Sequence, residues 1–159
     1  MVLLGLLRRR WLAALLVSGV LAGTAPGYIG LMPGSTGMVT VSGRGSTWDY
    51  AYTGAGGNFL WVGAGGSGTL TISDGGRVTS TTATVYMGGM QSGLAGVGVI
   101  NIGAAAGKTP AAPGTLTTPI VSMTSSVGSG SAFLVFNHTD TSGNYEFAPV
   151  IIGGSTGAA

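Results

Sequence analysis

The sequence predicts an all-β protein whose main part is a parallel β-solenoid of roughly four coils at roughly 30 residues per coil. Three observations predict this fold. Glycine supplies 32 of the 159 residues and charged residues only 6%, a composition that suits short strands joined by turns. Apolar and polar residues alternate in stretches such as "GTLTI", as they do along a β-strand. These stretches recur at a nearly constant spacing, which is typical of repeat architectures.

The N-terminal residues 1–25 have the pattern of an export signal. Arginines at positions 8–10 precede the apolar stretch "WLAALLVSGVLA" (11–22) and the small residues "GTA" (23–25). Positive charge, apolar core and small residues in that order are typical of a secretory signal, with twin-arginine export as the alternative to general secretion. We therefore expect a signal helix here, cleaved near Ala22 or Ala25, followed by a linker over residues 26–36.

Three glycine-led stretches define the repeat. "GMVTV" begins at Gly37, "GTLTI" at Gly68 and "GVINI" at Gly98, so the two intervals differ by a single position. A second series, "LWVG" (60–63) and "VYMG" (85–88), follows the same period less strictly. Short strands cannot bury an apolar face alone, whereas stacked coils bury it in a continuous column. A β-sandwich or a set of hairpins is the alternative fold.

Strand alternation assigns the side chains of each repeat to two faces. The apolar positions on one face are predicted to form the core: Val39, Val41, Leu70, Ile72, Ile100 and Ile102. The opposite face carries Thr40, Thr71 and Asn101. We expect Leu70 and Ile72 to be buried and Thr71 to be exposed.

The last third of the chain keeps its strand character but loses the register. "KTPAAPGTLTTP" (108–119) contains three prolines and predicts an excursion, after which "PIVSM" (119–123) and "SAFLVFNH" (131–138) resume as strands. Residues 150–152 are apolar and are expected to form an open, uncapped edge. We therefore assign residues 37–159 to the solenoid and expect it to be truncated at its C-terminal end.

The charged residues exclude several classes of function. Outside the arginine cluster, the chain has three basic and four acidic residues, so it has no basic patch for nucleic acid. "GAAAGKT" (103–109) is similar to a phosphate-binding loop, but Ile102 stands where its first glycine should be, and Pro110 follows where a helix should begin. We interpret this stretch as a turn and expect no nucleotide.

Few residues are candidates for catalysis. His138 is the only histidine, and the chain has no cysteine, so a metal site is not expected. Asp140 and Glu146 lie near it in sequence, but no particular serine is indicated as a nucleophile. Asp49 and Asp74 are separated by slightly less than one repeat and could lie on neighbouring coils, as the carboxylates of a polysaccharide-cleaving enzyme would.

Three aromatic residues are candidates for a contact surface. We expect Trp48, Trp61 and Tyr86 to point outward, where they would form a contact stripe or pack on turns. We assign no catalytic, cofactor-binding or metal-binding residue and expect no cofactor. The favoured function is non-catalytic, with a carbohydrate-active β-helix enzyme as the alternative.

Five stretches occur in an order that points to a known family: "VTVSGRGSTW" (39–48), "FLWVGAGGSGTLTISDGGRVTS" (59–80), "GVINIGAAAG" (98–107), "APGTLTTPIV" (112–121) and "FNHTDTSGNYEFAPVIIGGSTG" (136–157). Together they resemble the passenger domains of bacterial autotransporters of the type V secretion pathway, with their β-helix repeats. The resemblance implies a right-handed parallel β-helix that is exported through the periplasm and displayed at the outer membrane or cell surface.

The resemblance also implies partners. A passenger domain of this family would make adhesin-like contacts with host surfaces or other cells, through a ligand that the sequence does not specify. It would reach the surface through a β-barrel translocator. The alternating ten-residue strands typical of such a barrel do not occur after residue 136, so we expect the translocator to be encoded downstream or elsewhere.

Overall fold

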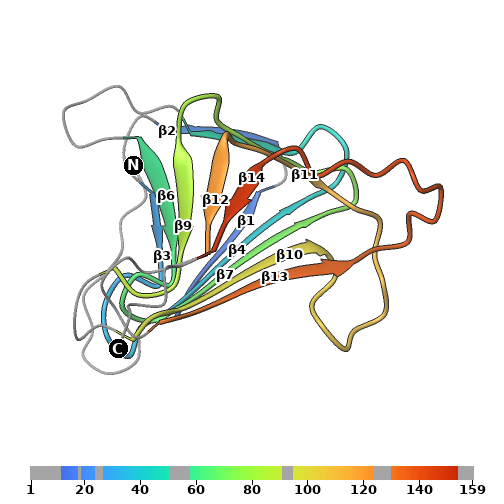
Figure 1. Ribbon diagram of the computed structural model, residues 1–159. Coiled ribbons are helices and arrows are strands. Elements are labelled where there is room, and N and C mark those ends of the chain that lie inside the picture. Colours follow the sequence, from blue (N-terminus) through green and yellow to red (C-terminus); the bar gives the residue numbers. More distant parts are fainter. Residues whose placement is uncertain are drawn as a thin grey trace.

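The computed structural model describes residues 12–17, 19–23, 27–50, 58–90, 95–123 and 130–153. Within these ranges the chain forms strands and turns and no helix. The strands make three parallel sheets, called here sheets A, B and C, which enclose a common interior (Figure 1). The predicted all-β solenoid of about four turns is therefore confirmed.

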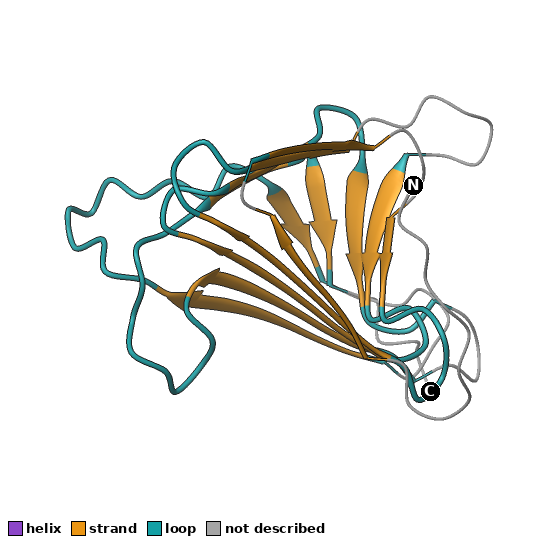
Figure 2. Ribbon diagram, turned by 180° about the vertical axis from the view of Figure 1, so that it is seen from behind, coloured by secondary structure: helices purple, strands orange, loops and turns teal. Residues whose placement is uncertain are grey.

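Each sheet collects one strand from successive coils. In spatial order, sheet A contains β1 (Leu12–Val17), β4 (Thr36–Ser42), β7 (Ser67–Ser73), β10 (Val97–Gly103) and β13 (Ser131–Asn137). Sheet B contains β11 (Thr115–Thr117), β8 (Arg77–Thr79), β5 (Thr47–Tyr50) and β2 (Val20–Gly23). Sheet C contains β14 (Val150–Ile152), β12 (Ile120–Ser122), β9 (Thr84–Met87), β6 (Phe59–Val62) and β3 (Gly27–Ile29). The chain visits A, B and C in turn, and Figure 2 shows the three sheets from behind.

The register of sheet A reproduces the spacing of the repeat. Thr36 lies opposite Ser67 and Ser67 opposite Val97, so the advances from β4 to β7 and from β7 to β10 match the intervals between the leading glycines. The next advance, from Val97 to Ser131, is a few positions longer. The longer coil contains the proline-rich excursion, so the register is kept even where the spacing is not.

The core consists of side chains that stack in columns from coil to coil. In one column of side chains, Leu70 lies between Val39 and Ile100, and Ile72 belongs to a second column beside it. Both Leu70 and Ile72 are fully buried. Their predicted burial is confirmed. Thr71 points to the outer face as predicted but is half-buried rather than exposed, because Asn101 Nδ2 of the next coil donates a hydrogen bond to its Oγ1 at 3.1 Å.

The leading glycine of each repeat lets sheets A and C approach closely. A Cβ atom on Gly68 would overlap the backbone nitrogen of Gly63 and the carbonyl oxygen of Ile29. A Cβ atom on Gly98 would overlap the carbonyl oxygen of Val62. Any side chain at these positions would separate the two sheets, because nothing but backbone lines the contact.

The N-terminal region differs from the expectation. Residues 12–17 and 20–23 form β1 and β2, parallel to β4 and β5, where we expected a signal helix. Strand β3 lies inside the expected linker, residues 26–36. A short apolar run does not distinguish strand from helix by its periodicity, and here it gains hydrogen bonds from the edge of β4 and buries Val17.

The first coil therefore begins before residue 37. Arg8, Arg9, Arg10 and Ala25 lie outside the described residues. Cleavage near Ala22 or Ala25 remains a prediction.

Within the described residues, the last coil is exposed in sheet C and covered in sheet B. The three residues of β14 are 61%, 48% and 43% exposed, in line with the expected edge. Beside them, Tyr145 and Phe147 pack against Phe136, with ring centroids 6.4 and 5.1 Å apart. Leu116, in the last strand of sheet B, is only 2% exposed. The loop over residues 138–149 thus acts as a partial cap, which the sequence did not predict.

Candidate functional site

Aromatic side chains gather on the outer face of sheet C. Tyr28, Trp61 and Tyr86 lie in register on β3, β6 and β9. The rings of Trp61 and Tyr86 stack with centroids 4.7 Å apart and an interplanar angle of 22°, and Phe59 meets Tyr28 edge-on at 5.4 Å. We call these four residues the aromatic cluster. Trp61 and Tyr86 are on the outer face as predicted.

Trp48 is not part of that face, and its predicted outward position is wrong. It is only 9% exposed and packs inside the solenoid, 5.9 Å from the ring of Tyr50. Alternation in β5 places the exposed Asp49 outside, so its two aromatic neighbours must point inward. The charge of Asp49, between Trp48 and Tyr50 in the sequence, was the signal that could have identified this orientation.

Tyr50 is the most unusual titratable group of the interior. Its side chain is 2% exposed, and its hydroxyl has no hydrogen-bond partner among the described residues. Burial raises the pKa of Tyr50 to about 12. The hydroxyl of Thr118 is close enough to oppose that shift in part, although it does not meet the geometry of a hydrogen bond with the phenol. Thr118 itself donates to the carbonyl oxygen of Ala83 at 2.5 Å. A neutral buried phenol of this kind serves packing, because it cannot reach solvent or substrate.

Asp74 has a structural role: it stabilises the turn that follows β7. Its backbone adopts a left-handed conformation, with φ at 53°. Its Oδ2 accepts hydrogen bonds from the hydroxyls of Ser42 (2.8 Å) and Ser73 (2.9 Å). Asp49 lies on the outer face of β5 instead. The two carboxylates therefore occupy different elements, and no shared partner joins them in the described part of the chain.

His138 lies directly after β13, against Tyr145, with ring centroids 4.6 Å apart. Its buried Nδ1 has no hydrogen-bond partner among the described residues. Asp140 accepts a hydrogen bond from the backbone N–H of Ser142 at 2.8 Å. Hydrogen bonds from Ser142 lower the pKa of Asp140, and the nearby His138 adds a smaller effect in the same direction. Glu146 is exposed.

Tyr145 ties this segment to the previous coil. Its hydroxyl donates a hydrogen bond to the carbonyl oxygen of Gly114 at 3.0 Å, and partial burial raises its pKa. The structure thus brings His138 to Tyr145 and not to Glu146. The arrangement packs a loop against the end of the solenoid and presents no activated nucleophile.

The loop over residues 103–109 is a turn held by the following coil. Asn137 Nδ2 donates to the carbonyl oxygens of Ala105 and Lys108, each at 2.8 Å. The backbone N–H of Lys108 donates to Ala105 at 3.1 Å. A phosphate-binding loop directs its N–H groups at the ligand. Here a loop N–H is used within the loop, and the Lys108 side chain is exposed.

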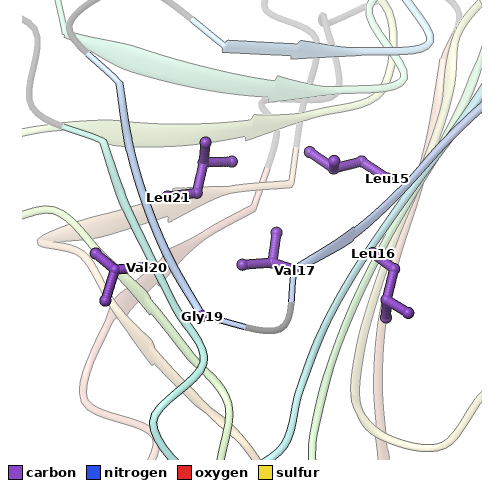
Figure 3. A pocket seen from close by; sticks show the side chains of 6 residues that line it. All are labelled: Leu15, Leu16, Val17, Gly19, Val20 and Leu21. Atoms are coloured by element: carbon purple, nitrogen blue, oxygen red, sulfur yellow. The ribbon is translucent and has the colours of Figure 1, made fainter.

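An aliphatic hollow lies at the N-terminal end of the solenoid (Figure 3). Its volume is about 230 Å³. Leu15, Val17 and Leu21 point into it, and Leu16 and Val20 point away. Within the described residues the hollow adjoins the hydrophobic interior, and none of its lining residues could act as an acid, a base or a metal ligand.

Neither a metal centre nor a membrane-spanning helix is found within the described ranges. No three side chains of the types His, Cys, Asp and Glu gather there closely enough to hold a metal ion. The same ranges contain no helix of sufficient length and hydrophobicity to cross a membrane.

These features define the chain as a parallel β-solenoid stabilised by contacts between coils. No protein family model and no solved structure matches it. Over 83 residues it is 36% identical to a protein of Escherichia coli (strain K12) named "Uncharacterized lipoprotein YdeK". The matched segment is 52% of this chain, and the chain spans only 6% of the length of that relative.

Proposed function

We propose that the chain is a non-catalytic solenoid segment of an exported protein, with a structural and adhesive role like that of an autotransporter passenger. The observation that carries the proposal is that its polar clusters join one coil to the next. Ser42 and Ser73 converge on Asp74, and Asn101 donates to Thr71. Polar groups used in this way stabilise the stack of coils, which supports a structural role.

The comparison supports an envelope or surface location. The relative from Escherichia coli is, by its name, a lipoprotein. The chain contains no cysteine, which suits a polypeptide that crosses a membrane before folding. The resemblance to autotransporter passengers supports a route through the periplasm to the cell surface.

Exposed apolar side chains on the outer faces support a role in contacts with host surfaces or neighbouring cells. Met32, Met38 and Phe133 are 60%, 45% and 54% exposed. Single exposed apolar residues are normal, but these accompany outer strands of very low charge. Such a surface favours broad contact with another macromolecule over recognition of a charged ligand.

Cell fractionation tests the export part of the proposal. The full chain with a C-terminal epitope would be produced in a Gram-negative host, beside a matched variant that lacks residues 1–25. The full chain is expected in the periplasmic and envelope fractions, and the variant in the cytosol. Fusion of the full chain to an autotransporter barrel should make the epitope sensitive to protease on intact cells. A full chain that stays in the cytosol would contradict export.

Mass spectrometry of the exported protein shows whether the N-terminal segment is removed. Cleavage near Ala22 or Ala25 would remove β1 and β2 and leave β4 and β5 as edge strands. An intact N-terminus would instead indicate that the apolar segment is retained in the first coil. We expect cleavage, because the order of charge, apolar core and small residues matches an export signal.

An assay with soluble polysaccharides tests the non-catalytic part. No release of reducing ends is expected from the purified chain. Release that disappears in Asp49→Asn or Asp74→Asn variants would contradict the proposal and favour a carbohydrate-active enzyme.

A further inference from the structure

We propose that the aromatic cluster on the outer face of sheet C binds a neutral glycan built of pyranose rings. This assignment rests on the adhesive role proposed above and gives that role a ligand class. The cluster lies on β3, β6 and β9, after the expected cleavage positions. Strands β6 and β9 each have a parallel neighbour on both sides, so the cluster lies within the stack of coils.

The four rings of the cluster hold one another in place. The indole N–H of Trp61 donates a hydrogen bond to the carbonyl oxygen of Gly88 at 2.6 Å, which fixes the plane of that ring. The ring of Phe59 meets the other three rings edge-on, at centroid distances between 5.4 and 6.3 Å. A surface that is already ordered loses little conformational entropy when a ligand docks on it.

The ring of Tyr86 leaves one of its faces to a ligand. Its other face is covered by Trp61, at a centroid distance of 4.7 Å. On the side away from Trp61, the residue in register on β12 is Ser122, whose side chain is too short to cover a six-membered ring. A pyranose ring presents a face of C–H groups of similar size. These groups carry partial positive charge, which the negative face of an aromatic ring attracts.

Uncharged polar groups lie beside the rings. Thr84 is in register with Phe59 on the outer face of sheet C. Just before the same two strands, Asn58 Nδ2 donates to the hydroxyl oxygens of Thr82 at 2.6 Å and Ser80 at 3.4 Å. Hydroxyl and amide groups both donate and accept hydrogen bonds, as the hydroxyl groups of a sugar do. Sites for organic ligands combine an aromatic or apolar surface with a few polar groups that orient the ligand.

The distribution of charge favours an uncharged ligand. The strands of sheet C contain no charged residue. The charged residues of the described part of the chain lie on sheet B or in the segments that follow the strands of sheet A: Arg44, Asp49, Asp74, Arg77, Lys108, Asp140 and Glu146. A nucleic acid or an anionic polysaccharide would meet no opposite charge on the sheet that carries the rings. A neutral glycan needs none.

Isothermal titration calorimetry of the full chain tests the proposal with defined probes. These are three soluble neutral polysaccharides (a glucan, a mannan and a galactan), with heparin and phosphatidylcholine vesicles for comparison. At least one neutral polysaccharide should bind, and heparin and the vesicles should not. Absence of binding to all three would overturn the proposal. Binding of heparin or vesicles as tightly as the best neutral polysaccharide would also overturn it, because the rings would then not select an uncharged sugar.

Substitutions of Tyr86 test the site itself. Tyr86→Leu keeps an apolar side chain but removes the ring, and the dissociation constant for the polysaccharide should rise about fivefold or more. Tyr86→Phe keeps the ring and should bind nearly as tightly as the unchanged chain. The matched control is Phe133→Leu, because Phe133 is 54% exposed but lies on sheet A. Equal affinities of Tyr86→Leu and this control would overturn the site.

A larger side chain at position 122 tests which face of the Tyr86 ring is used. Ser122→Phe places a ring against that face, so binding should be lost although every ring of the cluster is retained. Cross-strand aromatic pairs stabilise a sheet, so the free energy of unfolding should stay the same or rise. Circular dichroism verifies the strand content of each variant. Undiminished binding by the folded Ser122→Phe variant would overturn the assignment of the ligand to this face.

Adhesion of the displayed protein distinguishes the glycan site from the wider adhesive role. Cells that display the chain through an autotransporter barrel should adhere to host cells or to one another, and the soluble neutral polysaccharide should compete. Adhesion that responds neither to the polysaccharide nor to Tyr86→Leu would overturn the glycan site and leave the adhesive role standing. Absence of adhesion with the epitope at the surface would overturn the adhesive role, whereas the calorimetry reports on the glycan site alone.

Discussion

Leu70 and Thr71 are adjacent in the chain and experience different environments. Leu70 is enclosed by the columns of three coils and has no exposed surface. Thr71 lies on the outer face, where its hydroxyl oxygen accepts a hydrogen bond from Asn101. A single residue in a solenoid thus interacts mainly with its equivalents one repeat away in the sequence, since those occupy the neighbouring coils.

Truncation at these two positions should have unequal effects. Leu70→Ala is expected to reduce the free energy of unfolding by about 2–5 kcal/mol, because it leaves a cavity in a fully buried column. Thr71→Ala should reduce it by about 0.5–1.5 kcal/mol, the contribution of one hydrogen bond. Chemical denaturation of both variants measures the difference. Equal losses would mean that the strand is buried on both faces.

The buried Tyr50 is expected to lower the free energy of unfolding of the solenoid as the pH becomes alkaline. In the folded state its pKa is about 12, against 10.0 for an ordinary tyrosine. Between these values the unfolded chain loses the proton and the folded chain keeps it, so the folded state becomes less stable as the pH rises. Above pH 12 the group contributes no further change.

Tyr50→Phe should remove that dependence. The unchanged chain is expected to lose up to about 3 kcal/mol more than the variant between pH 10 and pH 12. Near neutral pH the variant should be as stable as the unchanged chain or more so, since the hydroxyl it removes is buried without a partner among the described residues. Urea denaturation at several pH values provides the measurement. Parallel pH profiles for the two proteins would show that Tyr50 is accessible to solvent.

At the scale of elements, a glycine near the N-terminal end of each of the three internal strands of sheet A sets the spacing between sheets A and C. Gly37, Gly68 and Gly98 lie in register on β4, β7 and β10. Each faces backbone of sheet C or of the turn that follows it. The corresponding residue of β13 is Ala132, which is half-buried in the last coil.

An alanine scan of two glycines should separate close contact from backbone strain. Gly98→Ala places a Cβ atom on the backbone of Val62 and Gly88, and overpacking of this kind should cost about 3 kcal/mol. Gly107→Ala meets no atom within 4 Å and is strained only by its positive φ of 72°, which should cost about 1 kcal/mol. Thermal unfolding ranks the two, and the opposite order would contradict the close approach of the sheets.

The local alternation of apolar and polar residues was sufficient to predict some strands but not others. The internal strands of sheet A were predictable because they are long, with a leading glycine and clear alternation. The strands of sheet B were not, since strands this short carry too little pattern, and the inward side of Trp48 was missed there. Strand β1 was mistaken for a helix because its apolar run fits both. The partial cap depends on Tyr145 meeting Phe136 and Gly114, contacts that no local pattern encodes.

At the scale of the whole molecule, stability is shared between neighbouring coils, and each coil contacts only the next. Within the described ranges, Asp49, Asp74 and His138 lie on separate elements of this stack, as expected where each residue meets mainly its equivalents in the neighbouring coils.

Distances between spin labels along one column test the parallel solenoid most directly. Met38, Thr69, Val99 and Phe133 occupy one outer column on β4, β7, β10 and β13, and the chain has no native cysteine to interfere. Cysteine pairs at 69/99, 38/99 and 38/133 would be labelled with nitroxides. The backbone separations should rise as ~4.8, ~10 and ~14 Å, one strand spacing per coil. A 69/99 pair that is farther apart than the 38/99 pair, or distances that do not increase with coil number, would contradict the solenoid and its register.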